Sequence, residues 1–244
     1  MQRRTFIKKS GYGGLALSIL PGLGLIQDPE FGLDELMGKA DIELFGKGIN
    51  LRKGAHDAFL EMKKAAYSDG IDLKIVSSYR SFSRQDAIWE RKYLQFTEGN
   101  RMRGLAAIEK IIAYSTIPGT SRHHWGTDID IVDGYRKVSG DVLVPEKFEG
   151  EGPYVLFKKW MDENANKFGY YLVYTNDPKR KGFKYEPWHY SYAPISIPML
   201  KAFRGKNILK LIMQEDLIGK EHFTAGFLKG YIQDNILDIN PELL

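Results

Sequence analysis

Residues 118–130 read Pro118-Gly119-Thr120-Ser121-Arg122-His123-His124-Trp125-Gly126-Thr127-Asp128-Ile129-Asp130. This stretch carries His and Asp, which are both common zinc ligands, on either side of the glycine at position 126. From residue 127 to residue 132 the sequence alternates, so that Ile129 and Ile131 can face a core. Asp128 and Asp130 then face the opposite side. The stretch therefore predicts a turn followed by a strand with one apolar face and one acidic face.

A second group of chemically suitable residues, Glu186-Pro187-Trp188-His189, follows about sixty residues later. Two His, one Asp and a spare Glu are the components of a hydrolytic zinc site that keeps an open coordination position. The chain has no cysteine, so any zinc must be held by His and carboxylate side chains. That ligand chemistry favours a catalytic over a structural zinc site.

The spacing within the first group does not decide which of its residues are metal ligands. His123 and Asp130 are seven residues apart, and an unbroken strand would place them on opposite faces. A turn at Gly126 would allow both to reach one metal ion. His124 could be the ligand in place of His123, and spacing does not choose between them. Taken alone, the pair has an ordinary structural interpretation, in which His123 is a core residue and Asp130 is a surface residue of a strand.

Glu186 and His189 are three residues apart, which on a helix would put them on one face. Pro187 and the aromatic neighbours favour a kinked strand instead. A neutral imidazole can bind zinc, while a carboxylate that is not a ligand can accept a proton. The alternative is a surface Glu and a hydrogen-bonded His. The helical His-Glu-x-x-His signature is absent from the sequence, so thermolysin-like metalloproteases are not supported.

The stretch Ser78-Tyr79-Arg80-Ser81 lies where a predicted strand runs into a helix. Arg80 could stabilise a developing oxyanion, because its guanidinium is permanently charged and fork-shaped. It could equally form a surface ion pair. Gln85, in the first turn of the helix, could be a plain surface residue.

The remaining elements follow from hydrophobic periodicity. Helices are predicted over 50–67, 83–95, 103–114, 154–168, 198–213 and 220–236, with Ser83 and Asp86 as a capping pair. Strands are predicted over 71–77, 127–132, 170–175 and 185–192, and a long loop over 133–152. Together these elements predict an α+β fold, with a small, mainly antiparallel sheet, helices packed on one face and a C-terminal helical extension.

Taken together, the site residues resemble the zinc D-Ala-D-Ala peptidases of bacterial cell-wall metabolism, the VanY-like carboxypeptidases, with their relatives among dipeptidases and phage endolysins. The resemblance covers about residues 45–193. The family has a Ser-x-His-x-x-Gly-x-x-x-Asp pattern, a Glu-x-x-His pattern with Trp before the His, and an upstream Tyr-Arg-Ser segment followed by a Gln. These patterns are met by Ser121, His123, Gly126 and Asp130, by Glu186, Trp188 and His189, and by Tyr79, Arg80, Ser81 and Gln85.

The resemblance implies one zinc ion per chain, held by His123, Asp130 and His189. It also implies Glu186 as general base and Arg80 near the scissile carbonyl, and it selects His123 over His124. Further residues carried over as shaping the pocket or touching the substrate are Ser121, Tyr79, Gln85 and Trp188. Many relatives have a small residue where this chain has Asp128, and we expect this second carboxylate to alter a substrate subsite or the electric field at zinc.

The resemblance implies hydrolysis of D-Ala-D-Ala or related bonds in peptidoglycan stem peptides. An endopeptidase that cuts within the stem or a cross-link, and a wall-binding module that keeps zinc without turnover, are the alternatives. We expect three parts of the chain: an export signal over 1–27, a peptidase domain over 28–193 and a helical extension over 194–244.

The start of the chain resembles a twin-arginine export signal, with Arg3-Arg4-Thr5-Phe6-Ile7-Lys8 followed by an uncharged run from Gly11 to Ile26. That run is short for a membrane span and contains Pro21. We therefore expect an exported, periplasmic protein with no stable membrane span in the mature chain. The formal net charge is +4, and removing the four basic residues before position 10 leaves 31 basic and 31 acidic residues. This balance gives no indication of a nucleic-acid partner.

Overall fold

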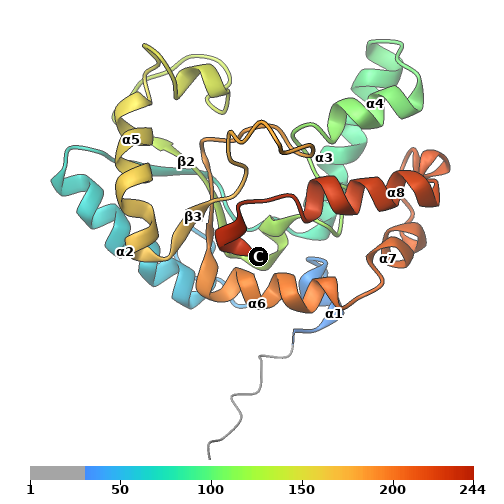
Figure 1. Ribbon diagram of the computed structural model, residues 1–244, viewed down its shortest axis with the longest axis horizontal. Coiled ribbons are helices and arrows are strands. Elements are labelled where there is room, and N and C mark those ends of the chain that lie inside the picture. Colours follow the sequence, from blue (N-terminus) through green and yellow to red (C-terminus); the bar gives the residue numbers. More distant parts are fainter. Residues whose placement is uncertain (1–30) are drawn as a thin grey trace, which may run out of the picture.

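The centre of the fold is a four-stranded antiparallel sheet (Figure 1). The structure is a computed structural model that describes residues 31–244, so the predicted export signal lies outside the described residues. The strands lie in the order β1 (Leu73–Ser77), β2 (Asp128–Asp133), β4 (His189–Tyr192) and β3 (Tyr170–Leu172). Every neighbouring pair is antiparallel. The α+β prediction is confirmed.

Two helices cover one face of this sheet, α2 (Lys53–Ser68) and α5 (Val155–Asn164). Ile129 and Ile131 of β2 point into the apolar cluster on this side, as the alternation of the strand predicts. The helices contribute residues at helical spacing, among them Phe59 and Met62 of α2 and Phe157 of α5. β2 is therefore anchored by its apolar face and presents its acidic residues to the other side.

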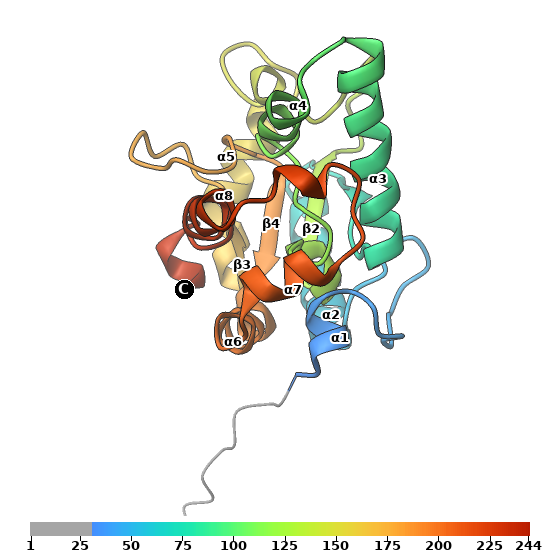
Figure 2. The same cartoon turned by 90° about the vertical axis from the view of Figure 1, so that its right-hand side faces the viewer.

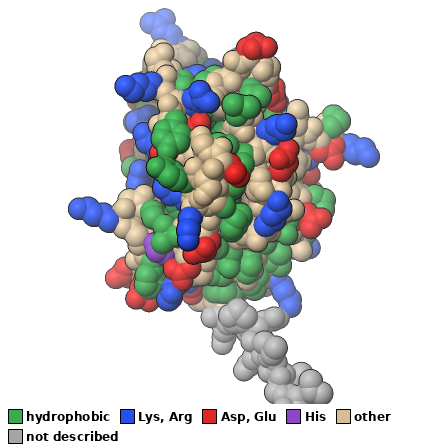
Figure 3. All heavy atoms as spheres, turned by 90° about the vertical axis from the view of Figure 1, so that its left-hand side faces the viewer, with side chains coloured by type: hydrophobic (Ala, Val, Ile, Leu, Met, Phe, Trp, Pro, Cys, Tyr) green, Lys and Arg blue, Asp and Glu red, His purple; other side chains and the backbone are tan. Residues whose placement is uncertain are grey.

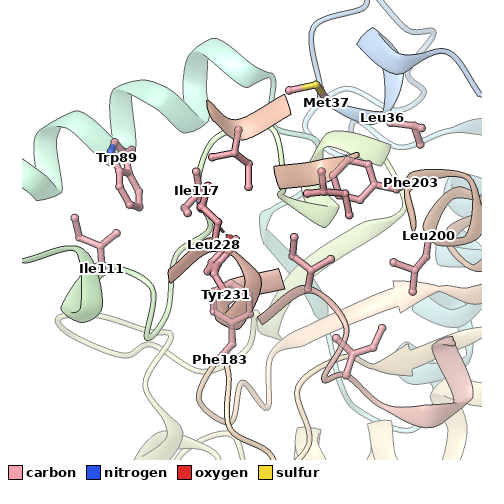
Figure 4. Packing of buried hydrophobic residues seen from close by; sticks show 14 of the residues in the cluster. Leu36, Met37, Trp89, Ile111, Ile117, Phe183, Leu200, Phe203, Leu228 and Tyr231 are labelled. Atoms are coloured by element: carbon pink, nitrogen blue, oxygen red, sulfur yellow. Dashed lines mark hydrogen bonds between the residues drawn. The ribbon is translucent and has the colours of Figure 1, made fainter. Parts of the chain in front are cut away.

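The opposite side of the sheet carries a second set of helices: α3 (Phe82–Leu94), α4 (Gly104–Ile111), α6 (Ala193–Arg204), α7 (Ile208–Gln214) and α8 (Ala225–Tyr231). Figure 2 shows α7 and α8 in front of β2 and β4. Residues 194–244 share one buried cluster with α3 and α4 (Figure 4). The indole nitrogen of Trp89 donates to the carbonyl of Ile218 at 3.0 Å. The predicted division of the chain near residue 194 stays a prediction.

Several element boundaries differ from the sequence prediction. Ser81, not Ser83, caps α3, because its hydroxyl accepts a hydrogen bond from the backbone nitrogen of Arg84 at 3.2 Å. The predicted helix over 198–213 is divided into α6 and α7, and Asn207 caps the second of them. The predicted strand over 185–192 begins only at His189, because a turn precedes it.

The outer surface beside α2 and α5 carries interspersed side chains of both charges (Figure 3). A short helix, α1 (Leu33–Leu36), opens the described part of the chain and accepts a hydrogen bond from the Trp125 indole at its last carbonyl. Between residues 31 and 244, none of the helices combines the length and the hydropathy that a membrane crossing requires.

Candidate metal centre

The strand register brings a carboxylate and an imidazole together at the middle of the sheet. β2 pairs with β4 so that Asp130 lies opposite His189, and it pairs with β1 so that Asp130 also lies opposite Ser77. Residues opposite each other on neighbouring antiparallel strands have adjacent side chains. The sheet itself therefore places Asp130 beside His189, although they are 59 positions apart in the sequence.

His123 reaches the same place through a turn. It lies in a short 3-10 turn, Arg122–Trp125, which ends at Gly126 in the left-handed conformation with φ +66°. A Cβ added at Gly126 would lie 3.1 Å from Leu44 Cδ2 and 3.3 Å from Arg52 Cγ, so both backbone conformation and close packing favour glycine. The prediction that the chain turns at Gly126 is confirmed. Because His123 precedes this turn and is not part of β2, the alternation of side chains along the strand does not place it on the face opposite Asp130.

His123, Asp130 and His189 present one ligand atom each, and these three atoms lie within 4.8 Å of one another. His123 Nε2 is 3.3 Å from Asp130 Oδ2, and His189 Nδ1 is 3.8 Å from Asp130 Oδ1. All three side chains are buried. Among the described residues, nothing donates a hydrogen bond to the buried Oδ1 of Asp130. A buried carboxylate oxygen without a donor, next to two imidazole nitrogens, fits a divalent metal ion.

The two neighbouring histidines have different surroundings. Nδ1 of His123 bonds to the carbonyl of Ser78 at 2.8 Å, which directs Nε2 toward Asp130. Nδ1 of His124 bonds to the carbonyl of Arg80 at 2.6 Å, and its Nε2 accepts from the backbone nitrogen of Gly119 at 3.1 Å. Both nitrogens of His124 are thus engaged with the backbone. The geometry favours His123 over His124 as the residue that faces a metal ion.

His189 lies between two carboxylates. Its Nε2 is 2.9 Å from Asp128 Oδ2 and its Nδ1 is 3.0 Å from Glu186 Oε2. Burial lowers the pKa of His189, but its hydrogen bonds to Asp128 and Glu186 outweigh burial and raise the pKa to about 10. Burial raises the pKa of Glu186 above its ordinary value, although the bond to His189 opposes this. A raised pKa suits a carboxylate that takes up and returns a proton.

Arg80 is held beside Asp130 by neutral partners. Its Nη1 donates to Gln85 Oε1 at 2.7 Å and its Nη2 donates to Ser77 Oγ at 2.9 Å. Nη2 also lies 3.9 Å from Asp130 Oδ2. Gln85 is fully buried and donates to the carbonyl of Thr116 at 2.9 Å. Gln85 therefore fixes the guanidinium rather than facing an open space.

A cleft of about 570 Å³ opens over these groups. Within the described part of the chain, its lining includes most of the predicted site residues but neither Tyr79 nor Gln85. The predicted site residues in the lining are Arg80, Ser121, His123, Asp130, Glu186, Trp188 and His189. Another wall comes from the predicted loop over 133–152, which contributes Asp141 and residues 143–146. The substrate-binding roles of Ser121, Trp188, Tyr79 and Gln85 stay predictions.

Sequence reasoning did not single out Arg122. This residue is buried, its Nε donates to Asp128 Oδ2 at 2.9 Å and its Nη2 donates to Ser191 Oγ at 2.7 Å. The signal that could have found it is Asp128, because a second carboxylate on a covered strand face requires a positive partner. Arg122 is a cation in the same motif, six residues away.

Comparison with known proteins agrees with this geometry. A family model described as VanY, D-alanyl-D-alanine carboxypeptidase, matches residues 48–195. The protein YodJ of Bacillus subtilis is 30% identical over 203 residues, which cover 82% of this chain and 59% of YodJ. The chain therefore spans less than two thirds of the length of that relative.

Solved structures share the fold. A structure of VanYB in complex with D-alanine-D-alanine has a TM-score of 0.52 at 23% identity, over 73% of this chain and 92% of VanYB. A VanY D,D-pentapeptidase variant from a VanB-type resistance cassette, in complex with Zn(II), has a TM-score of 0.51 at 24% identity, over 68% of this chain and 86% of that one. With the family model matching more than half of its length, this chain belongs to the VanY D-alanyl-D-alanine carboxypeptidase family.

Proposed function

We propose that this protein is a zinc peptidase that hydrolyses D-Ala-D-Ala or related D-amino-acid bonds of peptidoglycan stem peptides. The observation that carries the proposal is the convergence of two His, one Asp, a separate Glu and an Arg in one cleft. Family membership supports the reaction, and the Zn(II) and D-alanine-D-alanine complexes of the structural neighbours support the metal and the substrate class.

The residues that would hold zinc are His123 through Nε2, His189 through Nδ1, and Asp130. When bound, zinc supplies Lewis acidity and lowers the pKa of water. The hydrogen bond from His123 Nδ1 to the carbonyl of Ser78 orients that ring. One such ion per chain accounts for the unpaired oxygen of Asp130.

Glu186 is the proposed general base. It lines the cleft beside His189 but is not one of the three grouped ligands. Its carboxylate takes a proton from the attacking water and returns it to the leaving amine. Burial raises the pKa of Glu186 above its ordinary value, which makes this carboxylate a stronger base toward the attacking water.

Arg80 is the proposed stabiliser of the charge that develops on the carbonyl oxygen. The guanidinium is fixed by Gln85 and Ser77, so it does not have to be reorganised as the charge appears. Its partial burial strengthens this interaction, because water screens the charge less. Ser121 and Trp188 line the same cleft and are proposed to shape it.

We further propose that the protein is exported and acts in the periplasm. The Arg3-Arg4 segment supports export, and a stem-peptide substrate lies outside the cytoplasm. Cell fractionation of the full chain and of an Arg3→Lys, Arg4→Lys variant tests this. Retention of the wild-type protein in the cytoplasm would contradict the proposal.

The deciding experiment is mass spectrometry of defined stem pentapeptides and cross-linked muropeptides after incubation with the zinc-loaded protein. Loss of one terminal alanine is the expected result. An internal cut would assign the site to an endopeptidase. No cleavage by a protein that binds one zinc per chain would support a wall-binding module and refute the peptidase. The Glu186→Gln variant is the matched control for a contaminating activity.

A further inference from the structure

Asp128 is a fully buried carboxylate whose two oxygens face four donors. Its Oδ2 lies 2.9 Å from Arg122 Nε and 2.9 Å from His189 Nε2. Its Oδ1 accepts from Ser191 Oγ at 2.6 Å and from Thr127 Oγ1 at 2.8 Å. The carboxylate is therefore held in one orientation, and one of its bonds goes to a residue of the metal centre.

The strand register explains why this bond forms. Asp128 lies opposite Ser191, and Asp130 lies opposite His189, on the paired strands β2 and β4. The side chains of Asp128 and His189 thus occupy diagonal positions on the same face of the sheet. His189 is flanked on β2 by two carboxylates that meet its two different nitrogens.

An imidazole binds a metal through one nitrogen only, and the hydrogen bond made by the other nitrogen sets which one that is. Because Arg122 also donates to Oδ2, the proton on the His189 bond must come from the imidazole. Nε2 is therefore the protonated nitrogen. Nδ1 is left on the side of the proposed metal ion, where it faces Glu186 Oε2 at 3.0 Å and Asp130 Oδ1 at 3.8 Å.

We propose that Asp128 is a positioning residue of the metal centre, which holds the His189 ring in the tautomer and orientation that present Nδ1 to the metal ion. Arg122 balances the charge of Asp128. The guanidinium of Arg122 is itself held in place by the Trp125 ring, whose centroid lies 4.8 Å from Cζ. This inference rests on the proposed zinc site, and it gives the second acidic residue of the motif a specific task.

The competing interpretation makes Asp128 only the structural partner of Arg122. Loss of Asp128 would then reduce stability without changing which His189 nitrogen carries the proton. The two interpretations separate in ¹⁵N-detected NMR of the histidine rings in the zinc-loaded protein. The ring of His123 supplies an internal reference, because its Nδ1–H bonds to a backbone carbonyl instead.

In the wild type, we expect His189 to show a slowly exchanging Nε2–H and a zinc-bound Nδ1. In Asp128→Ala, the Nε2–H signal of His189 is expected to disappear while the Nδ1–H signal of His123 persists. The zinc dissociation constant, measured by competition with a chelator, is expected to rise by about 10- to 100-fold. Asp128→Asn keeps an oxygen acceptor and should restore most of the signal and of the affinity.

Asp133→Asn is the matched control. Asp133 is buried on the same strand, but it accepts from the backbone nitrogen of Tyr135 at 3.0 Å and lies away from the His pair. This variant should retain wild-type zinc affinity. A zinc affinity of Asp128→Ala within about twofold of wild type, with the His189 Nε2–H signal retained, overturns the inference.

The inference can still be tested if Asp128→Ala does not fold. If Asp128→Ala is unfolded, the wild-type spectrum decides, because zinc bound at Nε2 of His189 overturns the inference and zinc bound at Nδ1 with Nε2–H protected supports it. A wild type that binds no zinc refutes the proposed function together with the inference. A wild type that binds zinc and cleaves peptide, beside an Asp128→Ala protein of unchanged affinity, refutes the inference alone.

Discussion

The phenol oxygen of Tyr231 lies 2.8 Å from Oγ1 of Thr120, and both side chains are buried. The same oxygen accepts a hydrogen bond from the backbone nitrogen of Ile117 at 3.0 Å (Figure 4). Tyr231 ends α8, whereas Thr120 lies in the loop that leads to Ser121 and His123. The C-terminal helices, which carry none of the metal ligands proposed here, thus support the loop that carries one.

Tyr231→Phe removes only the hydroxyl and leaves the Ile117 amide without its acceptor inside the protein. The free energy of unfolding is expected to fall by about 1–3 kcal/mol, the cost of an unsatisfied buried polar group. Urea unfolding measures this change. Tyr114→Phe, at a half-exposed phenol, is the control and should change stability by less than about 0.5 kcal/mol. Equal stability of Tyr231→Phe and wild type would contradict the proposed support.

The local features of the site were predictable because they depend on neighbours in the sequence. Alternation places Ile129 and Ile131 on the core face of β2, and the glycine at 126 supplies the turn. Both signals extend over fewer than ten residues. The family resemblance joined these local signals to Glu186 and His189, which periodicity alone could not do.

The surroundings of the ligands were not predictable in the same way. Alternation assigns Asp128 to the face of β2 opposite the core, which is the solvent face in many antiparallel sheets. Here a second layer of helices covers that face, so Asp128 is buried and requires Arg122 and Ser191. The contact between Tyr231 and Thr120 spans 111 residues and has no local signature.

Replacement of the two adjacent histidines should have different effects on metal content. His123→Ala removes a ligand atom and is expected to abolish stoichiometric zinc binding. His124→Ala removes a ring that bonds only to backbone groups, and the protein should still bind one zinc per chain. Metal analysis after dialysis measures both. Zinc lost from His124→Ala and kept by His123→Ala would reverse the assignment.

Acid is expected to destabilise the protein through His124. Burial lowers the pKa of His124 from 6.5 to about 3, although its bond to the Arg80 carbonyl opposes this shift. Between pH 6.5 and 3, His124 therefore binds a proton in the unfolded chain but not in the folded protein. This contribution to stability is complete above pH 6.5 and falls by up to about 1.4 kcal/mol per pH unit as the pH decreases through that range.

His124→Gln is the variant that isolates this effect, because an amide side chain can donate and accept but does not titrate. Urea unfolding at a series of pH values from 7 to 4.5 should show a shallower loss of stability in the variant than in the wild type. Parallel curves would mean that His124 is protonated in the folded state, contrary to its buried, doubly hydrogen-bonded position.

Glu186→Ala tests whether Glu186 acts in proton transfer and not in zinc binding. The carboxylate is not one of the three grouped ligand residues, so the variant is expected to keep one zinc per chain. The rate of peptide hydrolysis should fall by at least roughly a hundredfold, because the variant loses the carboxylate proposed to take the proton from water. Steady-state kinetics on a stem pentapeptide, with zinc content measured on the same sample, provide both numbers. Glu163→Ala, an exposed carboxylate on α5, is the control and should retain wild-type kinetics. Full activity in Glu186→Ala would remove this residue from the reaction, and loss of zinc would make it a ligand.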